Sequence, residues 1–167
     1  YSSKYYRWYN EERKGLFQLI RYQQITPSSQ KLEFPKISST IELSILKKIK
    51  GDPLGNYFFE DSKNVVYWHR IPAYFIKGVN FIPYFKSNRD GEKKSEDYKV
   101  FGVTDKKYSD LILSVMNSTL FYWHWFSISD GYHCGKKEIL SFPITLKEFK
   151  KDQLKSLSTL SSQLMRS

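Results

Sequence analysis

Apolar and polar positions change their spacing several times along the chain, and each spacing predicts a different element. Between positions 41 and 49 isoleucines recur every four residues, which places them on one face of a helix. Ser39 precedes Glu42 by three positions, the spacing of a capping box, in which each side chain bonds a backbone N–H at the helix start. We therefore expect a helix that begins after Ser39 and ends before Gly51, with lysines in its last turn.

The next part of the chain is rich in β-branched and aromatic residues, which favour strands. Short runs of them occupy positions 56–82 and are separated by proline and glycine; they read YFF, NVVYWHR, AYFI and VNFI. The sequence KVFGV at 99–103 predicts one more strand. Residues 86–99 contain no apolar side chain before Tyr98, so we expect a long mobile loop there.

A stretch of nineteen residues without a formal charge, from Leu111 to Ser129, has the length of a membrane-spanning helix. Seven of the nineteen are Ser, Thr, Asn or His, and lysines flank both sides, so we reject a membrane span. On a helical wheel the segment is apolar on most sides, which is typical of a helix buried in a core. We expect one central helix from Thr104 to Ile128.

After Pro143 the capping-box spacing recurs with Thr145 and Glu148. Leucines then follow at roughly helical spacing among many lysines. We therefore expect a C-terminal trailing helix that protrudes from the domain or docks on a partner.

These elements together predict an α+β fold, in which a small twisted mixed sheet packs against the buried central helix. At 167 residues the chain has the length of one domain. We divide it into an N-terminal arm or linker (1–30), a globular domain (31–144) and the C-terminal helix (145–167). Because the chain begins with Tyr1 and not with Met, we expect it to be a piece of a longer protein.

The charge balance favours a polyanionic partner. Lys and Arg number 27 against 17 Asp and Glu, which gives a net charge of +10. Lysines outnumber arginines 21 to 6, a profile that an AT-rich genome also produces, so charge alone leaves both explanations open. The single cysteine, Cys134, excludes an internal disulfide framework and fits a reducing compartment, so we expect a cytoplasmic protein.

No arrangement of residues typical of an enzyme stands out. His124, His133 and Cys134 lie close in sequence, but no fourth ligand follows at a zinc-like spacing. A glycine-rich phosphate loop is absent from the sequence. Acidic-x-Lys fragments of the kind found in metal-dependent nucleases occur, for example Asp61 to Lys63, but a lysine-rich chain contains several by chance. We expect no metal or cofactor site in this segment, and a nuclease segment remains an alternative.

Clusters of basic residues alternate with aromatic residues and glycines, and they are the candidates for contacts to DNA. Lys and Arg neutralise phosphates, and Arg also reads guanine with two hydrogen bonds. Acidic neighbours weaken the net field around Arg89, so we expect it to make a directional base contact. The full set of candidate DNA-binding residues is Arg70, Lys86, Arg89, Lys136 and Lys137.

Four segments carry a resemblance to a known family. In chain order they are FPKISSTIELSILKKIK, VVYWHR, NSTLFYWHWF and EILSFPI. Their order and spacing resemble the TaqI-like C-terminal specificity region of adenine-specific DNA methyltransferases, which include the type IIG restriction–modification enzymes. The resemblance covers roughly residues 32–160.

The resemblance implies that residues 31–144 are a target recognition domain. Such a domain grips double-stranded DNA beside the catalytic methyltransferase domain of the same chain and reads base edges. The family's catalytic Asn-Pro-Pro-aromatic motif and its glycine-containing cofactor loop are absent from this sequence, so S-adenosylmethionine is expected only for the parent protein. Two other classes remain open besides the nuclease: a protein-interaction module that uses the leucines of the trailing helix, and a single-stranded RNA binder.

Overall fold

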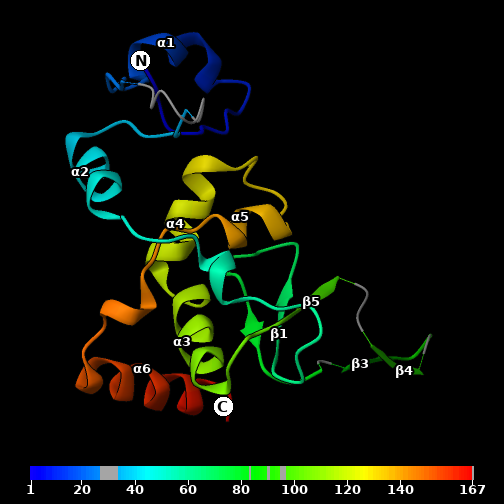
Figure 1. Cartoon of the computed structure of the whole chain (residues 1–167). Coiled ribbons are helices and arrows are strands. Elements are labelled where there is room, and N and C mark those ends of the chain that lie inside the picture. Colours follow the sequence, from blue (N-terminus) through cyan, green and yellow to red (C-terminus); the bar gives the residue numbers. More distant parts are fainter. Residues whose placement is uncertain (27–33, 83, 90, 95–96, 167) are drawn as a thin grey trace.

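The computed structural model confirms an α+β fold (Figure 1). It describes residues 1–26, 34–82, 84–89, 91–94 and 97–166. The helices are α1 (Leu16–Leu19), α2 (Thr40–Lys48), α3 (Lys106–Met116), α4 (Thr119–Ile128), α5 (Lys136–Leu140) and α6 (Lys151–Leu164), with 3-10 turns η1 (Glu12–Gly15), η2 (Leu54–Tyr57) and η3 (Leu146–Glu148). The strands are β1 (Val65–His69), β2 (Gly78–Val79), β3 (Tyr84–Ser87), β4 (Gly91–Lys94) and β5 (Tyr98–Gly102).

Helix α2 begins where the sequence predicts. The Ser39 hydroxyl accepts a hydrogen bond from the Glu42 N–H at 3.3 Å, and the Glu42 carboxylate accepts from the Ser38 N–H at 3.0 Å. The helix ends at Lys48, with Ile49 as its C-cap, before Gly51 as expected and with Lys47 and Lys48 in its last turn. The capping box is local chemistry, which is why the sequence predicts the start well.

The central sheet has the strand order β2-β1-β5. Both of its pairings are antiparallel, so the expectation of a mixed sheet is wrong. Trp68 of β1 stacks on Phe101 of β5, with ring centroids 4.2 Å apart. Both rings are buried in the core together with Ile112 and Met116 of α3.

Two of the predicted strands are not strands. The YFF run ends η2 and contributes only an isolated bridge between Phe58 and Val103. The AYFI run forms a bridge between Ala73 and Phe75 inside a bend. Tyr74 and Lys77 adopt positive φ angles of 73° and 58°, which an extended strand does not contain.

The segment expected to be a long mobile loop contains a two-stranded antiparallel ribbon. Strand β3 pairs with β4 in a register that sets Lys86 opposite Glu92 and Ser87 opposite Gly91. Gly91 has a φ of 69°, a conformation that glycine adopts without strain and that tight hairpin turns use. Polar composition alone therefore misidentified this segment. Positions 90, 95 and 96 of the expected loop lie outside the described residues.

The expected single helix from Thr104 to Ile128 is two helices, α3 and α4. The Asn117 side-chain amide donates to the Gly78 carbonyl at 2.8 Å, and its oxygen accepts from the Gly78 N–H at 3.0 Å. The Ser118 hydroxyl then caps α4 by accepting from the Phe121 N–H at 3.1 Å. These side-chain bonds compete with the helical ladder and break it. Phe121 and Trp125 are buried, so α4 keeps its expected role in the core.

The C-terminal helix starts later than expected and does not protrude. Thr145 accepts a hydrogen bond from the Asp52 N–H instead of capping a helix, and only the short turn η3 follows it. Helix α6 crosses α3 (Figure 1), and the Ser158 hydroxyl donates to Asp110 at 2.7 Å. None of the helices in the described part of the chain has the length and apolar character needed to cross a membrane.

Candidate nucleic-acid interface

The ribbon of β3 and β4 lies apart from the helices, beyond the start of β5 (Figure 1). Lys86 is an exposed residue of β3, and Arg89 is an exposed residue of the turn between the two strands. Tyr84, at the first position of β3, is also exposed. The structure therefore places two of the predicted DNA-binding residues on one narrow, solvent-exposed element.

A second group of basic residues lies around a groove of about 600 Å³ beside β5, which we call the β5 groove. Trp68 and Val100 line it together with the polar side chains. Its basic residues are Arg70 just after β1, Lys99 of β5, His133 in the turn before α5 and Lys136 at the start of α5. Lys99 and His133 are additions that the sequence interpretation missed.

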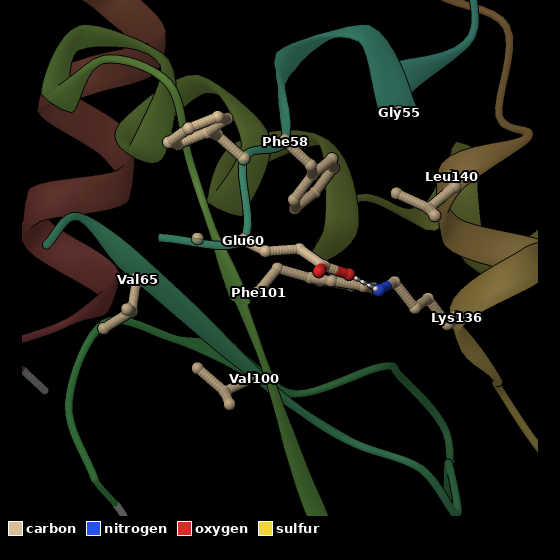
Figure 2. Close-up of a pocket in the computed structure, with 10 residues that line it drawn as sticks. Gly55, Phe58, Glu60, Val65, Val100, Phe101, Lys136 and Leu140 are labelled. Carbon is tan, nitrogen blue, oxygen red and sulfur yellow. Dashed lines mark hydrogen bonds and ion pairs between the residues drawn. The ribbon is translucent and has the colours of Figure 1, made fainter. Parts of the chain in front are cut away.

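The two predicted residues of the β5 groove are each held by a carboxylate. Arg70 Nε lies 3.1 Å from Asp97 Oδ1, and Lys136 Nζ lies 3.1 Å from Glu60 Oε1. Figure 2 shows Lys136 and Glu60 meeting above Phe101, whose ring centroid is 5.6 Å from Lys136 Nζ. Both predicted DNA-binding residues of the groove therefore have an acidic partner in this structure.

The Lys136–Glu60 pair closes one side of a smaller cavity of about 450 Å³ (Figure 2). Val100 lines both this cavity and the β5 groove. Strand β5 is an edge strand of the sheet, and it contributes lining residues to both hollows. Lys137, next to Lys136 on α5, is exposed and lines neither hollow.

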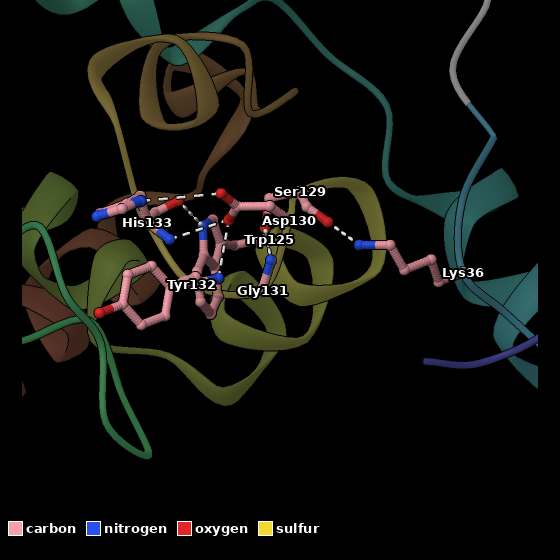
Figure 3. Close-up of polar contacts among 7 residues, drawn as sticks. All are labelled: Lys36, Trp125, Ser129, Asp130, Gly131, Tyr132 and His133. Atoms are coloured by element: carbon pink, nitrogen blue, oxygen red, sulfur yellow. Dashed lines mark hydrogen bonds and ion pairs between the residues drawn. The ribbon is translucent and has the colours of Figure 1, made fainter. Parts of the chain in front are cut away.

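The turn between α4 and α5 is held by hydrogen bonds (Figure 3). Asp130 Oδ1 accepts from the N–H of Tyr132 at 2.8 Å and from the N–H of His133 at 2.9 Å. These two bonds lower the pKa of Asp130, so its carboxylate stays ionised. The indole of Trp125 donates to the His133 carbonyl at 3.1 Å, and Gly131 has a φ of 74°. The turn therefore presents Tyr132 and His133 in fixed positions.

The residues considered for catalysis have structural roles. Cys134 is buried, and desolvation, followed by the charge of Glu138, raises the pKa of its thiol to about 12. Asp105 of one acidic-x-Lys fragment caps α3, and its side chain accepts from the Lys107 N–H at 3.0 Å. Across residues 1–26, 34–82, 84–89, 91–94 and 97–166, no group of three or more His, Cys, Asp or Glu side chains could hold a metal ion.

The predicted residues thus fall into two groups. Lys86 and Arg89 share the ribbon, Arg70 and Lys136 share the β5 groove, and Lys137 lies beside the second group. Comparison of the chain with protein-family models, curated proteins and solved structures finds no match.

Proposed function

We propose that this chain binds double-stranded DNA in a sequence-specific manner, as the target recognition domain of an adenine-specific DNA methyltransferase or a type IIG restriction–modification enzyme. The observation that supports it most is the exposed antiparallel ribbon of β3 and β4, with Lys86 on a strand and Arg89 at the turn. A two-stranded ribbon is one of the few protein elements that the major groove of DNA admits.

The chemistry of the ribbon suits base recognition. Paired strands lie about 4.8 Å apart, and the major groove is about 12 Å wide, so one ribbon with its side chains fills it. Arg89 is at the end that enters first, where a guanidinium donates two bonds to the O6 and N7 atoms of guanine. Lys86, near the end of β3 and three positions before Arg89, is suited to a phosphate at the groove edge.

The β5 groove supports the second half of the proposal, which is contact with the phosphate backbone. Arg70 offers Asp97 its Nε and keeps further N–H donors on its Nη atoms. Lys136 forms an exposed ion pair with Glu60. Such a pair contributes little free energy, so a phosphate can replace the carboxylate at the ammonium group. Contacts of this kind fix the register of a duplex without choosing its sequence.

The proposal includes partners that lie outside these residues. A cytoplasmic parent protein would supply a catalytic methyltransferase domain that binds S-adenosylmethionine. Helix α6 offers a surface for such a domain, because Leu160 is 59% exposed and Leu164 is 48% exposed while Leu157 packs on the core. These exposed leucines also favour a second candidate function, a protein-interaction module whose basic charge is incidental.

The test measures binding of the 167-residue chain to a fluorescent duplex by anisotropy, between about 50 mM and about 200 mM salt. Lys86→Ala should weaken binding to all sequences and reduce the slope of log K against log salt by about 0.9, the value for one phosphate contact. Arg89→Ala should reduce the preference for a selected site over a scrambled one about tenfold. The matched control removes the same charges elsewhere, with Lys151→Ala and Arg13→Ala.

If the ribbon variants and the control variants changed duplex affinity equally, the ribbon would not be part of the DNA interface. A wild-type chain without duplex affinity at about 50 mM salt, where phosphate contacts are strongest, would refute DNA binding. In that case, a stable complex with a partner protein that Leu160→Asp abolishes would support the protein-interaction module.

A further inference from the structure

A small cavity lies between the N-terminal arm and the turn after α4, and its lining residues are different from those of the β5 groove. Its volume is about 390 Å³, within the range of small-molecule sites. It is lined by Tyr5, Arg7, Phe126, Asp130, Gly131 and Tyr132.

The arm that supplies one wall of the cavity is attached to the domain. The Ser2 hydroxyl donates to the Pro35 carbonyl, and Lys4 forms an ion pair with the buried Glu42 at 3.4 Å. The ring of Tyr5 meets the ring of Phe126 edge to face, with centroids 6.3 Å apart and an interplanar angle of 84°. Tyr5 therefore has a defined position against α4.

The opposite wall is the hydrogen-bonded turn shown in Figure 3. Asp130 fixes the backbone of Tyr132, and the Tyr132 ring meets the His133 ring at 4.4 Å. Tyr5 is 52% exposed and Tyr132 is 59% exposed, so both rings have aromatic surface available to a ligand. Exposed rings on rigid supports are the usual platforms for unstacked nucleobases.

The charged groups of the cavity select among ligands. Within the described part of the chain, no ion pair joins the cavity residues Arg7 and Asp130, and Asp130 Oδ2 lies 3.8 Å from His133 Nδ1. Arg7 would repel a quaternary ammonium ligand, and Asp130 would repel a bare phosphate. A flat aromatic ligand with acceptors on one edge and donors on another satisfies both groups.

We propose that this cavity binds an unpaired guanine base. Guanine presents O6 and N7 acceptors to the Arg7 guanidinium, and its N1–H and N2–H donors face the Asp130 carboxylate. Tyr5 and Tyr132 supply the stacking surfaces. A base inside a duplex covers its faces with neighbouring bases, so the site takes only a base that is outside the stack. The inference does not depend on duplex binding by the ribbon.

The test uses single-stranded nonamers of thymidine whose central nucleotide is deoxyguanosine or deoxyadenosine, with the whole chain and anisotropy as the readout. The wild-type chain should prefer the guanine nonamer about tenfold. Tyr132→Leu should weaken its binding about tenfold, because a stacking ring is lost. Asp130→Asn keeps an oxygen for the two backbone N–H groups but should abolish the preference for guanine. Tyr9→Leu, which replaces an exposed tyrosine outside the cavity, should leave binding unchanged.

Equal affinity of the wild-type chain for the two nonamers would overturn the proposal, and this result requires no variant to fold. Unchanged guanine binding in Tyr132→Leu would overturn it as well. The variant Lys86→Ala separates the two sites, since it should weaken duplex binding while the guanine nonamer still binds as to wild type. Loss of nonamer binding in Lys86→Ala would assign the guanine to the ribbon instead.

Discussion

Gly102 is the position in β5 where a single methyl group should cost the most stability. A Cβ added there would lie 1.9 Å from the carbonyl oxygen of Phe59. Real Cβ atoms essentially never come within 3.0 Å of another heavy atom, so Gly102→Ala requires the two backbones to separate by 1.1 Å (3.0 − 1.9). The obstacle is backbone and not a flexible side chain, so it cannot rotate away.

The separation has a calculable cost. It breaks the hydrogen bond from the Phe59 N–H to the Gly102 carbonyl, now 3.0 Å long, which contributes about 1 kcal/mol. It also strains the packing of Phe58, whose ring centroid lies 4.5 Å from that of Phe101, by about 2 kcal/mol. We expect Gly102→Ala to lower the free energy of unfolding by about 3 kcal/mol, a large part of the stability of a small domain.

Urea denaturation followed by tryptophan fluorescence measures this difference. The control is Gly15→Ala, because the nearest atom to an added Cβ at Gly15 is Leu19 Cδ1 at 3.7 Å. That variant should stay within about 0.5 kcal/mol of wild type. If Gly102→Ala lost no more stability than Gly15→Ala, the close approach of Phe59 to β5 would be refuted.

Two further predictions concern ionisable groups. Burial raises the pKa of Glu42, but bonds from Ser38 and Ser39 and the charge of Lys4 outweigh it and lower the pKa below 4.5. A carboxyl whose pKa is lower in the folded state stabilises the protein at pH values above its unfolded pKa, so Glu42→Gln should lower the free energy of unfolding by about 1 kcal/mol at neutral pH. Urea denaturation at a series of pH values should show the stability difference between wild type and variant disappearing as the pH falls through the folded pKa. Cys134, with its pKa raised to about 12 mainly by burial, should react slowly with iodoacetamide at pH 8 until urea unfolds the chain; rapid labelling without urea would contradict its burial.

Features that depend on nearby residues were predictable from the sequence. The start of α2 follows from local bonds, in which Ser39 accepts from the Glu42 N–H and the Glu42 carboxylate accepts from the Ser38 N–H. The buried α4 follows from its charge-free composition. The ribbon carries a local signal as well, since an Asp-Gly pair at positions 90–91 is typical of a hairpin turn. That signal was outweighed by the polar composition around it.

Features that depend on distant partners were not predictable. The break between α3 and α4 requires Gly78 to meet Asn117, which lies 39 positions away. Lys136 turns toward Glu60 across 76 positions, so its neutralisation could not be inferred from its neighbours in sequence. The same holds for Lys99, which becomes a candidate only because β5 places it at the groove.

The chain connects the two basic groups through β5, and this connection bears on the proposed binding mode. Strand β4 begins at Gly91, next to the ribbon turn, and Val100 of β5 lines the β5 groove, so the two groups lie close together in the sequence. At about 3.3 Å per residue, nine residues from Gly91 to Val100 span at most about 30 Å, close to the length of one turn of duplex DNA at about 34 Å. If the ribbon sits in the major groove of a duplex, Arg70 and Lys136 would therefore reach phosphates no more than about one helical turn away from it. Shortening this connection should weaken binding even with every basic residue present, because the two contacts would no longer match the DNA repeat.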